Sequence, residues 1–421
     1  MHLWAYFTDP ILRAPTWGTF FMCIGSALMG VILFLQKRSL LGESLSHAAY
    51  PGIVLGVTGM ALFFPQQEGW GFLAVLGAAF VSSLLGLVSV EWLERKKKVS
   101  ADTALCAVLS FFFGIGIVAM SFLQSSFPAW QRHVQMLLFG QAATMQDIHI
   151  FVYALLSVVV VLFFSLAFRP LQAFLFDRQY AKSLGIRVKA LERVIFLLLL
   201  LSLMIGIRSV GITLVSAMAV APAVAARQYT ESFRPMLWLA AIFGAISGLV
   251  GNFLSIALSQ EGMSLPTGPM IVLSSFTIAL LSLLFAPRRG WIARAYRIGA
   301  FRFRCVQENI LKQMWKQGKL KEEGILYRVA LWRLQNQGWV VKKGEGFELT
   351  LDGMRKAASV VRLHRLWELY LTQTLKVETH AVHHNAEEME HILTPELEAR
   401  LTAHLANPKR DPHQQPIPER F

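Results

Sequence analysis

Histidine and glutamate side chains gather near the end of the chain, in the stretch HHNAEEMEH at residues 383–391. Glu387, Glu390 and His391 stand at positions i, i+3 and i+4, so on a helix they share one face. Carboxylate oxygens with imidazole nitrogen and no thiolate suit Mn²⁺ or Fe²⁺ better than a structural zinc site. The other interpretation is a surface helix whose histidines are incidental.

The same two residue types recur at helical spacing in RLHRLWELYL, residues 362–371. His364 and Glu368 are four residues apart and therefore share a helix face. Two groups of this kind within the 28 residues 364–391 favour a metal-binding domain over a decorated surface helix.

A third pair of this kind lies in a strongly apolar part of the chain, in LLGESLSHAAYPG at residues 40–52. Glu43 and His47 are again four residues apart. Ionisable groups inside a bilayer are costly and usually functional, and a carboxylate with an imidazole can bind a divalent transition ion. The alternative is a buried Glu–His hydrogen bond that joins two helices.

The helices that carry these residues can be predicted from the distribution of apolar residues. The chain has 421 residues, 55% of them hydrophobic, and a formal net charge of +14. A membrane-spanning helix needs about 20 mostly apolar residues. Nine segments are candidates: 17–35, 45–64, 71–93, 103–124, 149–168, 191–208, 211–226, 236–258 and 268–286. The alternative is eight spans with one hairpin miscounted, since only SVG separates the sixth segment from the seventh. The sequence predicts an all-α polytopic membrane protein with about nine transmembrane helices and a C-terminal soluble, α-rich domain.

Lys and Arg are distributed unevenly over the connecting loops. Basic residues fall on alternate loops, among them QKR at 36–38, ERKKK at 94–98 and PRRGW at 287–291. The loops PQQEGW and SQEGMSLPTG carry none, and QSSFPAWQRH carries one. Because basic loops stay in the cytoplasm, the C-terminal domain is expected to be cytoplasmic.

Three apolar segments carry a resemblance to a known family. GESLSHAAYPG, GITLVSAMAVAPAVAAR at 211–227 and LPTGPMIVL at 265–273 resemble, in order, the permeases of zinc/manganese/iron ABC importers. The resemblance implies that Glu43 and His47 bind the ion on its path through a bacterial inner membrane. It also implies three partners: an ATP-binding cassette ATPase, a second permease subunit in a homo- or heterodimer, and an extracytoplasmic metal-binding protein.

The basic loop FDRQYAKSLGIRVKA, residues 176–190, predicts a short amphipathic helix that ends at Gly185. It resembles the segment through which these permeases contact their ATPase, and that resemblance implies a coupling role for Asp177, Ala181 and Gly185. A solvated linker is the alternative. The chain has no G-x-x-x-x-G-K-[ST] sequence, so ATP hydrolysis is assigned to another subunit and the chain is not expected to be an enzyme.

The tail begins with a basic half. Residues 300–365 hold 14 Lys and Arg against six acids, whereas residues 366–421 hold five against nine. The pattern predicts helices at 306–317 and about 322–337, then a hairpin in GWVVKKGEGFELT, which together read as the end of a winged helix. Four basic residues would suit DNA phosphates: Arg328, Arg333, Lys342 and Lys343. A solvated basic face without nucleic acid is the alternative.

The tail also resembles the DtxR/MntR family of metal-dependent repressors, over about residues 306–418. The resemblance is carried by LTLDGMRKA, RLHRLWELYL, VHHNAEEMEHILTPELEARL and DPHQQPIP. It implies that Glu387, Glu390 and His391 are regulatory ligands, joined by His364, Glu368 and His383 in one or two sites. The expected ion is Mn²⁺ or Fe²⁺, with Zn²⁺ as a further option.

Two features depart from the repressors. Their first-helix ligand is usually Asp or Met, whereas that position here corresponds to Asn309, with Glu308 beside it. Only KQGKLK separates Trp315 from Glu322, so the helix-turn-helix looks shortened. The expected domains are a permease at 1–288, a basic juxtamembrane linker at 289–305, a winged-helix-like domain at 306–365 and a metal-binding and dimerisation domain at 366–421.

The sequence predicts a permease subunit of an ATP-driven Mn/Fe/Zn importer fused to a metal-responsive, repressor-like domain that contacts a DNA operator. In the alternative function, the tail is a metal-sensing gate that inhibits transport in cis and does not bind DNA. A regulator tethered to membrane lipid would reach only nearby DNA unless proteolysis near 289–305 released it. A secondary transporter is the third class, separated from the others by its independence of an ATPase.

Overall fold

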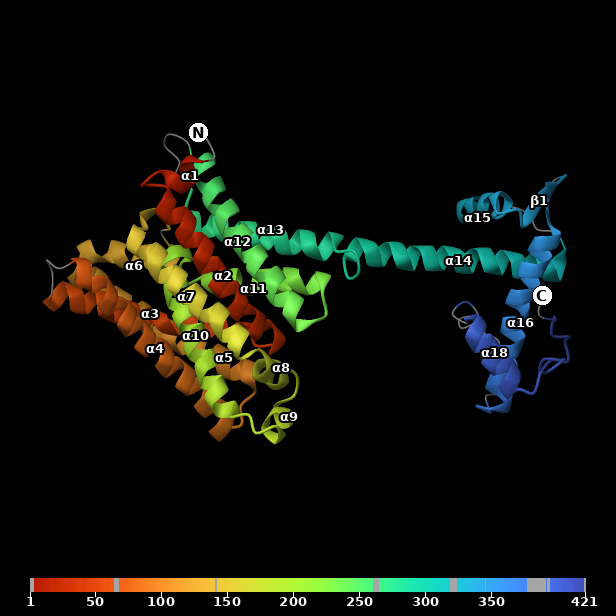
Figure 1. Cartoon of the computed structure of the whole chain (residues 1–421), viewed down its shortest axis with the longest axis horizontal. Helices are drawn as coiled ribbons and strands as arrows, with labels where there is room; N and C mark the ends of the chain where they lie inside the picture. Colours follow the sequence, from red (N-terminus) through yellow and green to blue (C-terminus); the bar gives the residue numbers. More distant parts are fainter. Residues whose placement is uncertain are drawn as a thin grey trace. The chain divides into compact units, whose positions relative to one another are not determined.

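A computed structural model describes residues 4–63, 68–140, 142–259, 265–318, 324–344, 346–376, 391 and 394–419. Its chain divides into two compact units, Met1–Ala293 and Arg294–Phe421, each with its own core. The described part is mostly helical, with one two-stranded sheet in the second unit (Figure 1).

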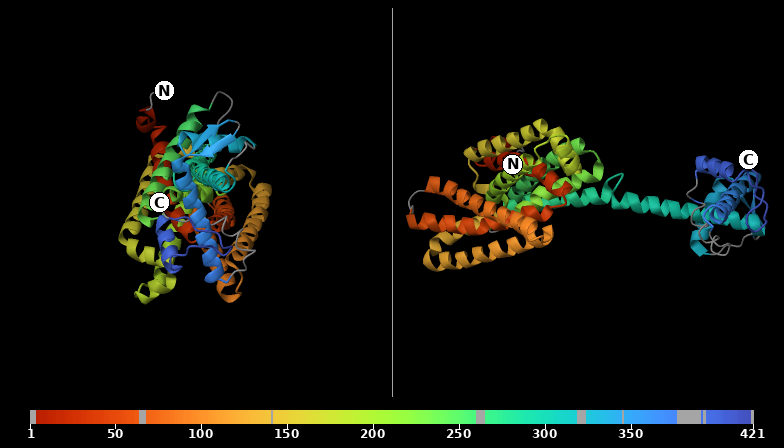
Figure 2. Two further views of the ribbon diagram at one scale, coloured as in Figure 1. Left: turned by 90° about the vertical axis from the view of Figure 1, so that its right-hand side faces the viewer. Right: turned by 90° about the horizontal axis from the view of Figure 1, so that it is seen from below.

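The first unit is a bundle of long helices that run roughly along one direction, as two further views confirm (Figure 2). Its helices are α1 (Ala5–Thr8), α2 (Arg13–Leu35), α3 (Ser39–Phe63), α4 (Glu68–Lys96), α5 (Ala101–Ser126), α6 (Gln131–Phe139), α7 (Asp147–Leu166), α8 (Phe168–Phe176), α9 (Arg178–Ser183), α10 (Val188–Val210), α11 (Val215–Tyr229), α12 (Phe233–Ala257) and α13 (Thr267–Phe285).

Eight helices in the described part are long and apolar enough to cross a membrane: α2, α3, α4, α5, α7, α10, α12 and α13. These match eight of the nine predicted spans. The ninth segment, 211–226, contains α11, which has 15 residues and is about 22 Å long. Because the hydrocarbon layer is about 30 Å thick, α11 alone is too short to span it.

The break between α10 and α11 is stabilised by α6. Gly211 has φ +99° and Gly140, at the end of α6, has φ +74°. The amide of Ile212 donates to the carbonyl of Leu137 at 3.2 Å. A Cβ on Gly140 would lie 2.3 Å from the carbonyl carbon of Val210, so the two backbones touch. Non-helical backbone in a membrane protein must be satisfied by the protein in this way.

Helix α3, which carries Glu43 and His47, is held between α4 and α5. Three hydroxyl groups link it to these neighbours. Ser44 donates to the carbonyl of Leu105 on α5 at 3.1 Å, and on α4 Ser83 donates to the carbonyl of Leu45 at 2.9 Å. The Ser82 hydroxyl donates to the carbonyl of Ala48 at 2.6 Å. These bonds satisfy polar groups inside the bundle and fix the rotation of α3.

The second unit has its own small core. It contains α14 (Trp291–Gln317, which begins just before the unit boundary), α15 (Gly324–Asn336), β1 (Val340–Lys343), β2 (Gly346–Leu349), α16 (Leu351–Gln373) and α18 (Pro395–His404). β1 and β2 pair antiparallel, with Val340 opposite Leu349 and Lys343 opposite Gly346. Buried side chains from α14, α15, both strands and α16 form the core: Ile310, Leu311, Met314, Ala330, Leu331, Leu334, Val340, Phe347 and Ala357.

The predicted second helix and the hairpin are both present in the second unit. The predicted first helix, 306–317, begins earlier, at Trp291, so most of the segment expected to be a linker is helical. Residues 291–305 contain no proline, so nothing in the sequence prevents the helix from beginning before the predicted start. The expected short turn after Trp315 includes residues 319–323, outside the described residues.

The Gly140 contact yields a stability prediction. Gly140→Ala combines a backbone conformation that is essentially restricted to glycine (φ +74°, ψ 149°), which costs about 1–3 kcal/mol, with a direct clash against Val210. Gly185→Ala is the matched control, because Gly185 has φ +78° but nothing within 4 Å of an added Cβ. Thermal melting in detergent should show a clearly larger loss for Gly140→Ala. Equal losses for the two variants would contradict close packing of α6 against the α10–α11 break.

Candidate metal sites

The membrane pair lies on successive turns of α3, and both side chains are half-buried. The imidazole of His47 packs against Phe113 of α5, with ring centroids 5.1 Å apart, and Phe113 in turn lies 5.4 Å from the ring of Tyr50. Aromatic rings therefore cover one side of His47 and fix its position next to Glu43.

Hydrogen-bonding partners of this pair were sought among the described residues. Within the described ranges, the buried Nδ1 atom of His47 has no hydrogen-bonding neighbour. No ion pair or hydrogen bond engages the carboxylate of Glu43 among those residues either, although its backbone carbonyl accepts from Ser46. The Glu–His hydrogen bond considered as the alternative is therefore absent from the described structure. A carboxylate and an unpartnered imidazole nitrogen on one helix face fit a divalent cation as substrate.

In the second unit, His391 contacts a residue that the sequence did not assign. Its Nδ1 atom lies 2.6 Å from Oε2 of Glu308 on α14, and both side chains are largely buried. Because a carboxylate only accepts, Nδ1 carries the proton, and the lone pair of the neutral ring is on Nε2. A carboxylate that orients a histidine in this way is a common feature of metal sites.

Asn309, which corresponds to the first-helix ligand of the repressors, is exposed. The neighbouring Glu308 points to His391 instead. One residue along a helix corresponds to a rotation of about 100°, so this shift changes which side chain faces the site. The buried positions Ile310, Leu311 and Met314 could have located the inward stripe of α14 in the sequence.

His364 and Glu368 lie together on α16, as predicted, and both are almost fully buried. Nε2 of His364 donates to Oε1 of Glu368 at 3.1 Å. The ammonium group of Lys312, also buried, lies 3.4 Å from Nδ1 of His364. Both ring nitrogens therefore have a partner within the protein, and a cationic side chain already lies at this pair.

The six ligands expected in the tail, here called the predicted cage, are His364, Glu368, His383, Glu387, Glu390 and His391. His383, Glu387 and Glu390 lie outside the described residues. Over the ranges that are described, no group of three His, Cys, Asp or Glu side chains could hold a metal ion. Two side chains of α14 therefore contact described members of the predicted cage. Glu308 contacts His391, and Lys312 contacts His364.

A buried arginine joins α16 to α18 and to the end of the chain. Arg362 donates from Nε to Glu398 at 3.0 Å, from one terminal nitrogen to the carbonyl of Pro418 at 2.7 Å, and from the other to Thr402 at 3.3 Å. Arg365 lies 3.4 Å from the carboxylate of Asp411. These contacts hold the helix that carries His364 and Glu368 against the C-terminal segment.

All four predicted DNA-contacting residues are exposed on α15 and β1. The Arg333 guanidinium lies 6.0 Å from the ring centroid of Phe303, and Lys343 pairs with Glu348 at 3.0 Å. The outer face of α15 also exposes four large apolar side chains, which are Ile325, Leu326, Val329 and Trp332.

The predicted coupling helix is α9. Asp177 caps it, because its carboxylate accepts from the amides of Gln179 and Tyr180. Ala181 is buried, and Gly185 ends the helix at φ +78°, where its amide donates to the carbonyl of Lys182. This left-handed glycine ending is the one that the sequence predicted.

Comparison with known proteins agrees with this division. Residues 8–286 match the family described as ABC 3 transport family, and residues 350–419 match the iron dependent repressor, metal binding and dimerisation domain. The chain is 34% identical over 447 residues to a probable metal transport system membrane protein of Chlamydia trachomatis, covering 98% of this chain and 97% of that protein. It is 31% identical over 390 residues to the manganese transport system membrane protein MntC of Bacillus subtilis, covering 89% and 87%.

Among solved structures, the chain is similar to PsaBC from Streptococcus pneumoniae in complex with Fab. The TM-score is 0.57 and the identity 24%, over 68% of this chain and 95% of the solved one. At this identity the likeness supports the fold of the membrane bundle.

Proposed function

Because the chain belongs to the ABC 3 transport family and carries a repressor-type metal-binding domain, we propose that it both moves and senses a divalent metal ion. Its membrane unit is the permease of an ATP-driven importer, and its second unit binds the same class of ion. The observation that carries the transport function is the unpartnered His47 Nδ1 beside Glu43 on α3.

The pair on α3 can attract and release a hydrated cation. In a medium of low dielectric constant, an unpaired carboxylate is costly, and a passing cation offsets that cost. With few fixed ligands, the ion is held weakly enough to leave again. The manganese relative favours Mn²⁺ as substrate, and the oxygen and nitrogen ligands are also compatible with Fe²⁺ or Zn²⁺.

The partners follow from what the chain lacks and what it exposes. Its sequence has no P-loop, so a separate ATPase supplies the hydrolysis. The capped helix α9 and its flanks expose Phe176, Tyr180 and Leu184, a surface suited to docking the ATPase. We also infer a second permease subunit, an extracytoplasmic metal-binding protein and, from the basic loops, a cytoplasmic location for the C-terminal domain.

In the second unit, His391 would hold the ion through Nε2 while Glu308 orients the ring, together with Glu387 and Glu390. His364 and Glu368 were expected as further ligands, with His383. Lys312 already supplies a positive charge there, and both nitrogens of His364 are engaged. A second cation would have to displace this ammonium group, so we propose that the tail binds one ion with high affinity.

Two functions are candidates for the second unit with its ion bound. The repressor-type domain and the four exposed basic residues on α15 and β1 support regulation through a DNA operator. The apolar outer face of α15 supports the alternative, a gate that inhibits transport in cis, because such a face suits a protein contact better than phosphates.

Replacing either membrane ligand should stop transport. Loss of a partner that only orients a ligand lowers metal affinity about 10- to 100-fold, so loss of Glu43 or His47 itself should reduce uptake at least that much. The measurement is uptake of radioactive manganese by cells that express Glu43→Ala, His47→Ala or the control His133→Ala, an exposed histidine on α6. Wild-type uptake by His47→Ala, at equal amounts in the membrane, would remove this pair from the ion path.

Glu308 should control affinity in the second unit. We expect Glu308→Ala to weaken Mn²⁺ binding about 10- to 100-fold, Glu308→Gln to weaken it less, and the exposed control Asn309→Ala to leave it unchanged. Binding is measured by calorimetry on the full chain in lipid nanodiscs, in a His47→Ala background that removes the membrane site. Similar affinities for Glu308→Ala and Asn309→Ala would show that Glu308 does not position His391.

One pair of assays separates the regulator from the gate. For a regulator, Mn²⁺ should increase DNA binding by the full chain, Lys342→Gln should weaken it, and affinity should fall steeply with salt. For a gate, DNA binding should be absent, and His391→Ala should raise uptake at high external manganese. Metal-dependent DNA binding with no effect of His391→Ala on uptake would eliminate the gate.

A further inference from the structure

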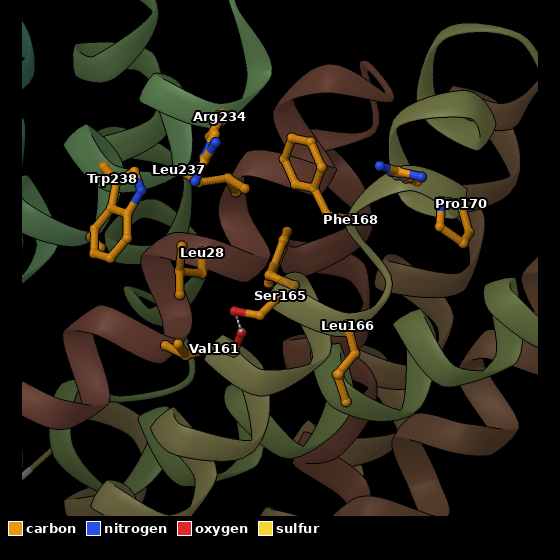
Figure 3. A pocket seen from close by; sticks show the side chains of 12 residues that line it. Leu28, Val161, Ser165, Leu166, Phe168, Pro170, Arg234, Leu237 and Trp238 are labelled. Carbon is orange, nitrogen blue, oxygen red and sulfur yellow. Dashed lines mark hydrogen bonds between the residues drawn. The ribbon is translucent and has the colours of Figure 1, made fainter.

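A groove lies where α7, α8 and α12 meet beside α2, with a cavity volume of about 520 Å³. Figure 3 shows the apolar side chains around it, which include Leu28, Val161, Leu166, Phe168, Leu237 and Trp238. The hydroxyl group of Ser165 donates to the carbonyl of Val161 at 2.8 Å, so it is already satisfied. The walls are otherwise largely apolar.

Two arginines, Arg169 and Arg234, lie at one end of the groove. Each is the middle residue of the same tripeptide. Phe-Arg-Pro occurs at 168–170, where α8 begins, and again at 233–235, where α12 begins. The rings of Phe168 and Phe233 stack with centroids 5.3 Å apart and planes inclined by 23°. This contact brings together the two backbone positions from which the arginines project.

These two arginines differ from their neighbours in charge pairing. Arg289 pairs with Glu231 and holds the pKa of that carboxyl below its usual range, and Arg227 donates to the carbonyl of Glu231. In the described part of the chain, neither Arg169 nor Arg234 has an acidic side chain within 4 Å, and both are exposed. Two guanidinium groups without an acidic partner, at one end of an apolar groove, suit a ligand that is an anion with an apolar tail.

We propose that this groove binds one anionic phospholipid, with the phosphate between Arg169 and Arg234 and an acyl chain along the apolar walls. From Arg234 to Ala241 the wall of α12 rises about 10 Å, enough for the first eight or so carbons of a chain. Leu166 and Trp238 are exposed on helices long enough to span a membrane, which places the groove within reach of lipid. Basic pockets between membrane helices on the cytoplasmic side are suited to anionic headgroups.

The test counts lipid retained by the purified chain in detergent, by native mass spectrometry, after addition of phosphatidylglycerol or phosphatidylcholine. We expect one tightly held phosphatidylglycerol and much weaker retention of phosphatidylcholine. Arg169→Gln with Arg234→Gln should weaken retention about 30-fold, since each arginine near an anionic headgroup contributes about fivefold. The matched control, Lys182→Gln with Lys189→Gln, removes two exposed charges elsewhere and should have no effect.

Two further variants distinguish a lipid groove from a simple phosphate site. Arg169→Lys with Arg234→Lys keeps both charges and should keep most of the binding. Ala241→Trp fills the apolar end and should lower phosphatidylglycerol retention although both arginines remain. Equal binding of glycerol phosphate and the lipid would show a phosphate site without an acyl channel and overturn the proposal. So would unchanged retention in the arginine-to-glutamine variant, or a change in its oligomeric state in place of lipid loss.

Discussion

A polar group inside a membrane must find its partner in the protein or in a bound ligand, and this constraint shapes the first unit. The hydroxyls of Ser44, Ser82 and Ser83 bond to carbonyls of neighbouring helices, and the backbone break at Gly211 bonds to the end of α6. These contacts fix α3 in the bundle. By contrast, among the described residues the half-buried carboxylate of Glu43 and the Nδ1 atom of His47 have no hydrogen-bonding partner, and for this reason we propose them as ligands of the ion.

In the second unit, histidine and glutamate side chains have hydrogen-bonding partners within the protein. There the two described ligand histidines each contact a charged side chain: His391 contacts Glu308, and His364 lies between Lys312 and Glu368. Glu308 and Lys312 both belong to α14, so this helix places one carboxylate and one ammonium group beside the two histidines. A preformed, hydrogen-bonded histidine suits a sensor that holds its ion until conditions change, whereas the sparse pair on α3 suits rapid passage.

Much of this architecture is predictable from the sequence, because bilayer thickness dictates the length of apolar segments and glycine marks where helices end. The hairpin around Gly344 and the end of α9 at Gly185 follow from such local rules. Other features depend on contacts that the sequence does not show. Glu308 was missed because one position along a helix turns a side chain by about 100°. The shortness of α11 depends on the Gly140–Gly211 contact, which joins residues far apart in the chain. His383, Glu387 and Glu390 lie outside the described residues, and their role stays a prediction.

The central claim is that one chain carries two separate divalent-ion sites, one for transport and one for sensing. The most direct measurement is the amount of Mn²⁺ bound per full chain in lipid nanodiscs, by equilibrium dialysis, for wild type, His47→Ala, His391→Ala and the double variant. We predict that each single variant loses a different class of site, the weak one for His47→Ala and the tight one for His391→Ala, and that the double variant loses both. Loss of all binding in either single variant, or unchanged binding in the double variant, would contradict the claim of two sites.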